Sequence, residues 1–349
     1  MRIHCFLLSG LILFLLTNCG TNIHINVMKP APITIAQSIQ SIVLVNRTSP
    51  KNEVVNLLEG VLTGEGINED KQGSEEALAG LNRILSETNR FQVKRATERY
   101  QGSGSGTTLP DPMDWNTIES ICKKYQTDAV ILLETYDSDF IVTNTEKDVE
   151  EKNSDGKTVK THKYYAQGIA SVNLGYRLYD PKNKTITDQY MFSHNRTWEG
   201  VGNNATDALT HLIGKSQAIQ AVSSDAGYEY GRRIAPMYTR VSRSLYTSGK
   251  DNIALASGAK KAQVNNWEGA IEDWKRALSM GDEKSKGRAA YNLAVANEVL
   301  GYLHESKKWA QTAYTEYDNK QAKSYVPLLD DRINDAAKLA DQLGVEPNW

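Results

Sequence analysis

The sequence predicts an α+β fold, in which a mixed β-sheet packs with helices and an all-α region built from a helical repeat follows. Two observations lead to this prediction. Between residues 39 and 238, short β-branched runs alternate with segments whose apolar residues recur every three or four positions. Between residues 251 and 349 the helical periodicity continues, and its residues repeat at a fixed offset. The 349 residues are enough for two domains.

The first residues have the pattern of an export signal. Arg2 gives a positive start, and an apolar run from Cys5 to Leu16 follows it. This run is shorter than the roughly 20 apolar residues that a membrane-spanning helix needs. A positive start, a short apolar core and a cut site mark a signal that is removed. We therefore expect residues 1–18 to be a signal peptide.

The residues Leu16-Thr17-Asn18-Cys19-Gly20 resemble the lipobox of bacterial lipoproteins. In that family the cysteine thiol receives a diacylglycerol, the bond before the cysteine is cleaved, and the new amine is acylated. The resemblance implies lipidation at Cys19 and a durable membrane anchor, because several acyl chains hold where one does not. The alternative is an ordinary export signal with an incidental cysteine.

Residues 19–38 are polar, contain two prolines and show no sustained period, so we expect a tether between the membrane and the first domain. The early part of this segment lacks the acidic run that resembles a surface-export signal of some Bacteroidetes lipoproteins. This absence favours an outer-membrane lipoprotein that faces the periplasm.

Composition narrows the classes of function. The chain is 40% hydrophobic and 23% charged, with a formal net charge of −2. A nearly neutral chain lacks the basic field on which nucleic-acid binding depends, so we expect no nucleic-acid partner. With Cys5 in the signal and Cys19 lipidated, Cys122 remains alone, which excludes an internal disulfide and argues against a zinc site. We expect Cys122 to be a small core residue.

Residues 39–238 are expected to form the α/β sandwich domain. In order, the patterns predict a buried strand, a loop, a helix, a strand, a capped helix and a central strand at residues 41–46, 51–73, 74–85, 91–93, 114–125 and 128–133. A hairpin follows, with Asp155-Gly156 at its turn, since this dipeptide is a strong hairpin signal. A further antiparallel step is expected over residues 168–196, then a helix over 203–222 and another ending near Ile234.

Several short segments of this domain resemble landmarks of the periplasmic α/β domain shared by the curli-secretion lipoprotein and the TolB amino-terminal domain. They lie at residues 42–48, 90–93, 127–131, 176–180 and 184–186. The resemblance implies this architecture rather than a particular activity. The curli-secretion channel inserts hairpins into the membrane, but the hairpin expected here is rich in charge and lacks an alternating apolar face. The whole layout resembles a Bacteroidetes lipoprotein family of unassigned function.

After a linker at residues 239–250, residues 251–349 are expected to form helical repeats closed by a capping helix. Trp267 aligns with Leu303 and Ala277 with Ala313, an offset of 36 residues. The segments around Trp267 and Trp274, and around Tyr291 and Asn292, resemble the helices of tetratricopeptide repeats. This resemblance implies a groove that binds a protein or peptide through Trp267, Trp274, Tyr291 and Asn292. Two alternatives remain: an unrelated helical bundle, or a groove filled by the chain's own helices.

No pattern in the sequence predicts a catalytic, metal or cofactor site. The six histidines lack metal-ligand spacing, and the glycines of residues 101–106 lack the Lys-Ser/Thr of a phosphate-binding loop. Acidic pairs such as Asp137 and Asp139 are expected to be solvated turn charge. One basic cluster, with tyrosines between its arginines, is expected either to meet phospholipid headgroups or an anionic glycan, or to be a solvated linker; it comprises Arg232, Arg233, Arg240 and Arg243.

These observations favour a non-enzymatic, lipid-anchored envelope protein that acts as a protein–protein interaction scaffold. A second hypothesis is a subunit of an outer-membrane secretion or assembly complex that oligomerises through the α/β domain. A third, an envelope hydrolase, has no motif to support it.

Overall fold

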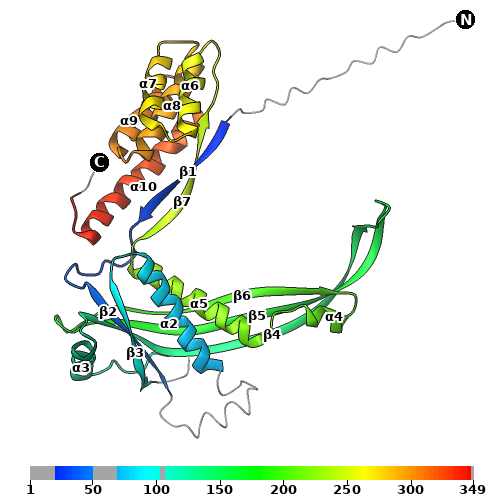
Figure 1. Ribbon diagram of the computed structural model, residues 1–349, viewed down its shortest axis with the longest axis vertical. Helices are drawn as coiled ribbons and strands as arrows, with labels where there is room; N and C mark the ends of the chain where they lie inside the picture. Colours follow the sequence, from blue (N-terminus) through cyan, green and yellow to red (C-terminus); the bar gives the residue numbers. More distant parts are fainter. Residues whose placement is uncertain (1–19, 50–68, 103–106, 347–349) are drawn as a thin grey trace, which may run out of the picture. The chain divides into compact units, whose positions relative to one another are not determined.

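The computed structural model describes residues 20–49, 69–102 and 107–346 (Figure 1). The expected signal peptide, Cys19 and most of the glycine-rich loop lie outside these residues. The described chain forms two compact units. Residues 20–28 and 238–338 make up the helical unit, and residues 29–237 with 339–345 make up the α/β unit. The fold is therefore mixed α+β with a helical region near the carboxyl end, as the sequence predicts.

The α/β unit is built on a five-stranded mixed sheet of order β3-β2-β4-β5-β6. The strands are β2 (Ser41–Ser49), β3 (Gln92–Gln101), β4 (Ala129–Lys152), β5 (Thr158–Asp180) and β6 (Thr185–Gly202). Strand β2 pairs in parallel with both β3 and β4, and the remaining neighbours are antiparallel. The predicted strands at residues 41–46 and 128–133 are thus the two central parallel strands.

Helices cover both faces of this sheet. Helices α2 (Glu69–Glu87) and α5 (Lys215–Ile234) pack on one face, and α3 (Trp115–Tyr125) packs on the other. Because side chains alternate along a strand, β2 sends Leu44 into the first core and Val43 into the second. The side chain of Asp114 caps α3 by accepting a hydrogen bond from Thr117 N–H, as its position predicts.

Cys122 lies on the core-facing side of α3 and is 7% exposed. Burial raises the pKa of its thiol to about 11, which keeps it protonated and inert at neutral pH. The expectation of a core role for Cys122 is confirmed.

Two element boundaries differ from the sequence predictions. Helix α2 begins at Glu69, so residues 69–73, expected as loop, are helical. The single helix expected over residues 203–222 is two helices, α4 (Ala205–Thr210) and the longer α5. The break has a backbone cause: Gly214 is extended, at φ −66° and ψ 144°, and serves as the N-cap of α5.

The helical unit contains α6 (Ile253–Gln263), α7 (Trp267–Ala277), α8 (Glu283–Val299), α9 (Leu303–Thr315) and part of α10 (Lys320–Leu343). Short turns join consecutive helices (Figure 1). Small residues allow close approach within each pair: Gly258 lies against the indole of Trp274, and the Ser306 hydroxyl donates to the carbonyl oxygen of Ala294 at 2.7 Å. The expected capping helix is longer than predicted and begins at Lys320, ahead of Pro327.

Parts of two predicted connecting segments are strands. The prediction of a tether at residues 19–38 is wrong for residues 20–29, and the prediction of a linker at residues 239–250 is wrong for residues 239–246. Strand β1 (Gly20–Lys29) and strand β7 (Met237–Tyr246) form a two-stranded sheet. The reason is a period of two in β1, where Ile23, Ile25 and Val27 alternate with exposed polar residues. Ile23 packs against the core of the helical unit, and Val27 is 4% exposed.

Glycines allow α2 and α5 to pack closely. A Cβ atom added at Gly227 would lie 1.8 Å from the carbonyl oxygen of Ala77, and one at Gly80 would lie 2.1 Å from that of Ser224. These obstacles are backbone atoms of the facing helix, so they cannot move without shifting that helix.

Gly227→Ala should therefore destabilise the α/β unit by about 1–3 kcal/mol, the usual cost of overpacking a core. Urea unfolding of the full chain, followed by circular dichroism, measures this loss. Gln217→Ala, at an exposed position of the same helix, is the matched control and should change stability by less than about 0.5 kcal/mol. An unchanged unfolding midpoint for Gly227→Ala would contradict the close packing of the two helices.

Candidate functional site

An extended segment of the same chain, residues 243–250, packs along α8 in the helical unit, against Tyr291 and Asn292, two residues expected to line a partner-binding groove. This segment follows α8 in the antiparallel direction, and its contacts run from one end of that helix to the other. Arg243 binds Glu298 near the carboxyl end of α8. Near the amino end, Arg288 donates to the carbonyl oxygen of Ser248 at 2.7 Å.

Glu298 fixes the first end of the segment. Its carboxylate is 0% exposed and binds Arg243 through two hydrogen bonds, 2.6 Å from Nε and 2.7 Å from Nη2. The Tyr325 hydroxyl donates to Oε2 at 2.5 Å, and Arg332 Nε donates to Oε1 at 3.3 Å. Burial alone would lower the pKa of Arg243, but the hydrogen bonds and charge of Glu298 raise it. Burial and then the charge of Glu298 raise the pKa of Tyr325. Arg243 and Glu298 therefore form a buried bidentate ion pair, and the Glu298 carboxylate accepts four hydrogen bonds in all.

Asn292 fixes the middle of the segment by its backbone. Its Oδ1 accepts from the Tyr246 N–H at 2.9 Å, and its Nδ2 donates to the Tyr246 carbonyl oxygen at 2.8 Å. The Tyr246 ring meets that of Tyr291 edge-on at 5.4 Å, and the Arg288 guanidinium lies 5.1 Å from its centroid. One side-chain amide thus satisfies both main-chain groups of a residue at the end of β7, as a strand neighbour would.

The structure places all four predicted partner-binding residues inside the helical unit. Trp267 and Trp274 are 8% and 0% exposed, and the Trp274 indole N–H donates to the carbonyl oxygen of Leu255. Tyr291 and Asn292 are 5% and 0% exposed and contact residues 244–246. The side of α8 that was expected to bind a partner is therefore covered by the chain itself, by a strand and its following loop rather than by helices. In this arrangement none of the four side chains is open to a partner.

A second candidate site is the arm, which we define as residues 147–163 of the β4–β5 hairpin. The β4–β5 register continues without a break from Thr135 and Gly175 to Lys152 and Thr158. Strand β6 accompanies β5 only as far as Tyr164. Within the described chain the arm therefore consists of two strands without a third neighbour, and it extends past β6 (Figure 1). The Asp155-Gly156 dipeptide predicts the hairpin turn, but no pattern in the sequence predicts an arm of this length.

The turn and the base of the arm are well defined by contacts. At the turn, the Asn153 side chain accepts hydrogen bonds from the Asp155 and Lys157 N–H groups, and Gly156 has φ +76°. At the base, α4 packs on β6 so closely that a Cβ at Gly200 would lie 2.3 Å from the carbonyl oxygen of Ala208. Pairing across the arm thus continues from a packed base to a tight turn.

The arm is polar, and its two strands differ in charge. Residues 150–160 are exposed throughout. The β4 strand carries three acidic residues, Asp148, Glu150 and Glu151, and two lysines, at 147 and 152, for a net charge of −1. The β5 strand carries Lys160 and Lys163, for a net charge of +2, together with His162 and no acidic residue. His162 Nδ1 lies 2.8 Å from Asp148, and the hydrogen bonds of Asp148 and then Glu146 raise the pKa of His162. Charge attraction across the arm therefore supports its strand pairing.

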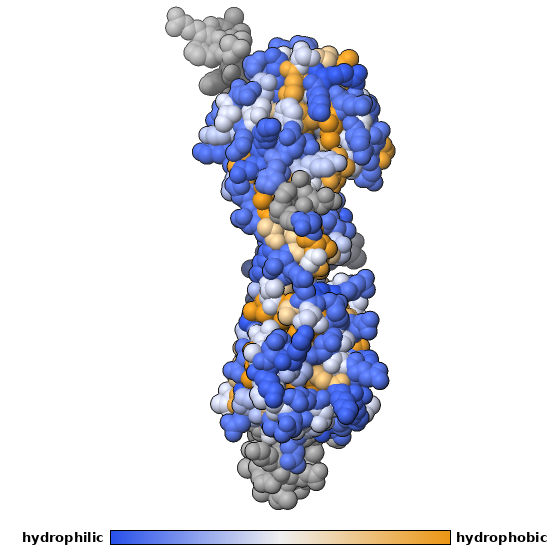
Figure 2. Space-filling view, turned by 90° about the vertical axis from the view of Figure 1, so that its left-hand side faces the viewer, coloured by the Kyte–Doolittle hydropathy of each residue, from blue (hydrophilic) through white to orange (hydrophobic). Residues whose placement is uncertain are grey.

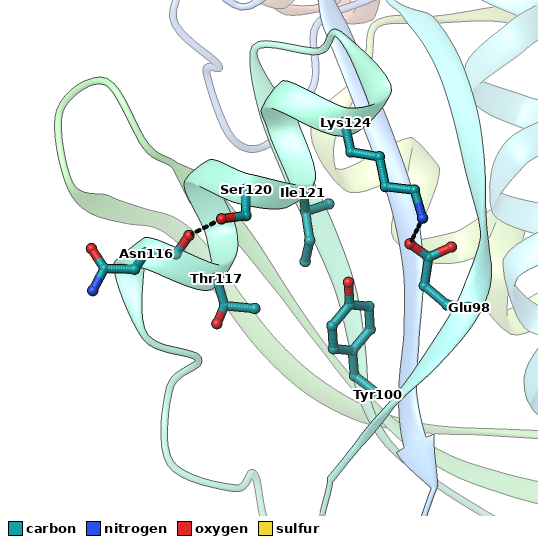
Figure 3. Close-up of a pocket in the computed structure, with 7 residues that line it drawn as sticks. All are labelled: Glu98, Tyr100, Asn116, Thr117, Ser120, Ile121 and Lys124. Atoms are coloured by element: carbon teal, nitrogen blue, oxygen red, sulfur yellow. Dashed lines mark hydrogen bonds and ion pairs between the residues drawn. The ribbon is translucent and has the colours of Figure 1, made fainter.

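A shallow pocket of about 340 Å³ lies between β3 and α3 (Figure 3). Figure 3 shows the Lys124 amine directed at the Glu98 carboxylate, with Tyr100 and Ile121 beside them. The hydrogen bonds of Lys124 and then Tyr125 lower the pKa of Glu98 to about 2. A carboxylate held charged in this way is a poor general acid or base near neutral pH.

Glu134, a buried carboxylate of the α/β unit, is also paired with cations. Glu134 is 0% exposed and accepts hydrogen bonds from Arg47, Arg177 and Tyr179. Of the predicted basic cluster, Arg233 pairs with Asp188 and Arg243 with Glu298, while Arg232 and Arg240 are exposed.

No group of three or more His, Cys, Asp and Glu side chains in residues 20–49, 69–102 and 107–346 could hold a metal ion. None of the described helices combines the length and the apolar composition that crossing a membrane requires. On the face drawn in Figure 2, hydrophilic residues predominate and apolar residues form narrow patches.

The fold and these sites define a two-unit α+β protein. In its helical unit residues 243–250 cover α8, and its α/β unit carries the arm. Residues 39–246 match the family described as Domain of unknown function (DUF8603), and the chain belongs to that family. Residues 256–331 match a second family, Domain of unknown function (DUF6340). No curated protein matches the chain.

Among solved structures, the chain is similar to a Helicobacter pylori protein described as a homolog of a neuraminyllactose-binding hemagglutinin. The identity is 13%, the match covers 57% of this chain and 82% of that one, and the TM-score is 0.25. At that score the likeness carries no argument about fold or function.

Asn292→Ala should destabilise the helical unit, because it removes the partner of two main-chain groups of Tyr246. An unpaired buried polar group costs about 1–3 kcal/mol. Thermal unfolding of the full chain should show this loss, and the Tyr246 amide should exchange faster with deuterium. Gln311→Ala on the exposed side of α9 is the control and should change stability by less than about 0.5 kcal/mol. Equal stability of the two variants would contradict a role for Asn292 in holding β7.

Proposed function

We propose that this chain is a non-enzymatic, lipid-anchored protein of the cell envelope that acts as an interaction scaffold, with the arm as its docking element. The arm is the observation that carries the proposal. It exposes both faces of a two-stranded sheet, and its outer backbone edges pair with no other strand in the described chain. Such edges are templates for another polypeptide strand.

The energetics of the arm support the same role. An isolated two-stranded hairpin is marginally stable in water, because it buries little apolar surface. Residues 147–163 contribute nothing to the hydrophobic cores of either unit. A long extension of this kind therefore does not serve the stability of the monomer, and a partner strand would supply the burial and hydrogen bonds that it lacks.

The helical unit contributes to the scaffold in a different way. Its helix pairs, with the offset of 36 residues and small residues at the close approaches, support a tetratricopeptide-like repeat. Its groove is occupied by residues 243–250, so we assign the unit a structural role rather than a peptide-binding one. The lipobox-like residues before Gly20 support an anchor at Cys19 in the outer membrane, facing the periplasm, in a Bacteroidetes-type lipoprotein.

A second candidate function is self-assembly into a secretion or assembly ring. The difference in charge between the two strands of the arm favours it. The β4 strand of one copy, with a net charge of −1, is complementary to the β5 strand of the next, with a net charge of +2. Such a head-to-tail contact propagates into a ring or a filament. A two-fold contact would instead bring like charges together.

One variant tests both functions. Replacing residues 147–163 with Asn-Gly joins Glu146 to Tyr164, which are directly opposite one another, through a two-residue hairpin turn. The variant should keep the stability of the parent chain, because the arm lies outside the cores. A photo-crosslinking residue at Thr143, just outside the arm, should give discrete protein adducts in cells with the parent chain and lose them in the variant.

The matched control keeps the arm and changes only the turn, Asp155→Asn. Identical adducts from the parent and the shortened variant would contradict a docking role for the arm. Mass measurement in detergent separates the two functions: a discrete oligomer that the shortened variant loses supports self-assembly, and a monomer bound to a different protein supports the scaffold.

A further inference from the structure

Strand β1 begins at Gly20, the residue directly after Cys19, and residues 20–28 belong to the helical unit. The expected tether between lipid and fold is therefore a strand that pairs with β7. We infer that the β1–β7 sheet of the helical unit lies on the membrane surface, against the headgroups of anionic phospholipids. This inference rests on the proposed lipidation of Cys19.

The short stretch of chain between Cys19 and β1 places the start of β1 close to the membrane. A flexible tether of about 19 residues would reach about 60 Å when fully extended. With β1 folded, one peptide unit of about 3.8 Å separates the Cα atom of a lipidated Cys19 from that of Gly20. The acyl chains must enter the hydrocarbon layer, so the start of β1 must lie at the depth of the headgroups.

The composition of β1 and β7 is compatible with binding to phosphate headgroups. Neither β1 nor β7 contains an aspartate or a glutamate. In β1 the exposed positions are Asn22, His24 and Asn26. In β7 they are Tyr238, Arg240 and Ser242. Hydroxyls, amides and cations can bind phosphate groups, and no carboxylate on these strands would repel them.

On the exposed face of the β1–β7 sheet, Tyr238 and Arg240 are the two side chains best suited to contact lipid headgroups. Tyr238 is 70% exposed, an unusual state for a large aromatic side chain, and tyrosine is enriched where a membrane meets water. Arg240 is exposed, and no described residue neutralises it, whereas Arg243 on the covered side is neutralised by Glu298. Arg240 is therefore a cation on the outward-facing side of β7.

The same sheet cannot enter the hydrocarbon layer. A two-stranded sheet has unpaired backbone groups along its outer edges, and each unpaired group costs several kcal/mol in hydrocarbon. The fit is thus to the headgroup layer, where water and phosphate oxygens can satisfy these groups.

The test uses the mature, acylated chain in vesicles of phosphatidylethanolamine and phosphatidylglycerol. A nitroxide is attached at Asn26→Cys or Ser242→Cys, and Cys122 does not compete because it is buried. A nickel chelate on lipid headgroups should relax the nitroxide strongly. Insertion of about twenty Gly and Ser residues between Cys19 and Gly20 should reduce the effect, because the linker would then act as the expected tether. In the chain with this insertion, replacing phosphatidylglycerol with phosphatidylcholine, or adding Arg240→Glu, should abolish the remaining relaxation of the nitroxide.

Each outcome is decisive. Labelling with an alkyne fatty acid, lost in Cys19→Ala, establishes the anchor independently of the nitroxide. An acylated protein whose nitroxide ignores the headgroup nickel would overturn the membrane contact and leave the anchor intact. A protein that takes up no fatty acid would overturn the proposed anchor, and the membrane contact with it.

Discussion

The buried contact between Arg243 and Glu298 is the interaction on which the helical unit depends. A carboxylate that is 0% exposed is costly unless its charge and lone pairs are satisfied, and Glu298 is satisfied by β7 and α10 together. Three residues further along the segment, the Asn292 side chain forms hydrogen bonds with both the N–H and the carbonyl oxygen of Tyr246. Because these donors and acceptors come from different parts of the chain, α8 cannot complete its environment until β7 lies in the groove. The strand is thereby part of the core, and its neighbour β1 is held with it.

This constraint leaves α8 covered by the chain's own strand, so a partner surface must lie elsewhere. The helical groove is the expected interaction site of a repeat protein, yet a competing peptide would have to displace a segment that is covalently present at high effective concentration. What the fold leaves open is the arm, whose paired strands reach beyond β6 with their edges free. The two units therefore divide the work in our account: the helical unit organises the chain near its amino end, and the α/β unit presents the extension that meets other proteins.

Sequence patterns predicted the parts of this fold that rest on local signals. The β-branched runs at residues 41–46 and 128–133, the cap at Asp114 and the turn at Asp155-Gly156 each form as expected. The alternation of Ile23, Ile25 and Val27 was available too, but the prolines that follow it suggested a tether. The roles of Asn292 and Glu298 depend on a strand about 50 residues away, and no local pattern encodes that pairing. Tryptophans at repeat positions identify helix packing well, but they do not say whether a groove is empty.

Hydrogen–deuterium exchange at the Tyr246 amide tests the central claim most directly, because its only acceptor in the groove is the Asn292 side chain. On the full chain, our account predicts protection of this amide comparable to that of the buried amides of α8, and much faster exchange in the arm turn at Asp155. Tyr246 exchange as fast as that of the arm turn, with α8 still protected, would show that the strand leaves the groove readily. The helical unit would then be open to partners, and its assignment to a structural role would be wrong.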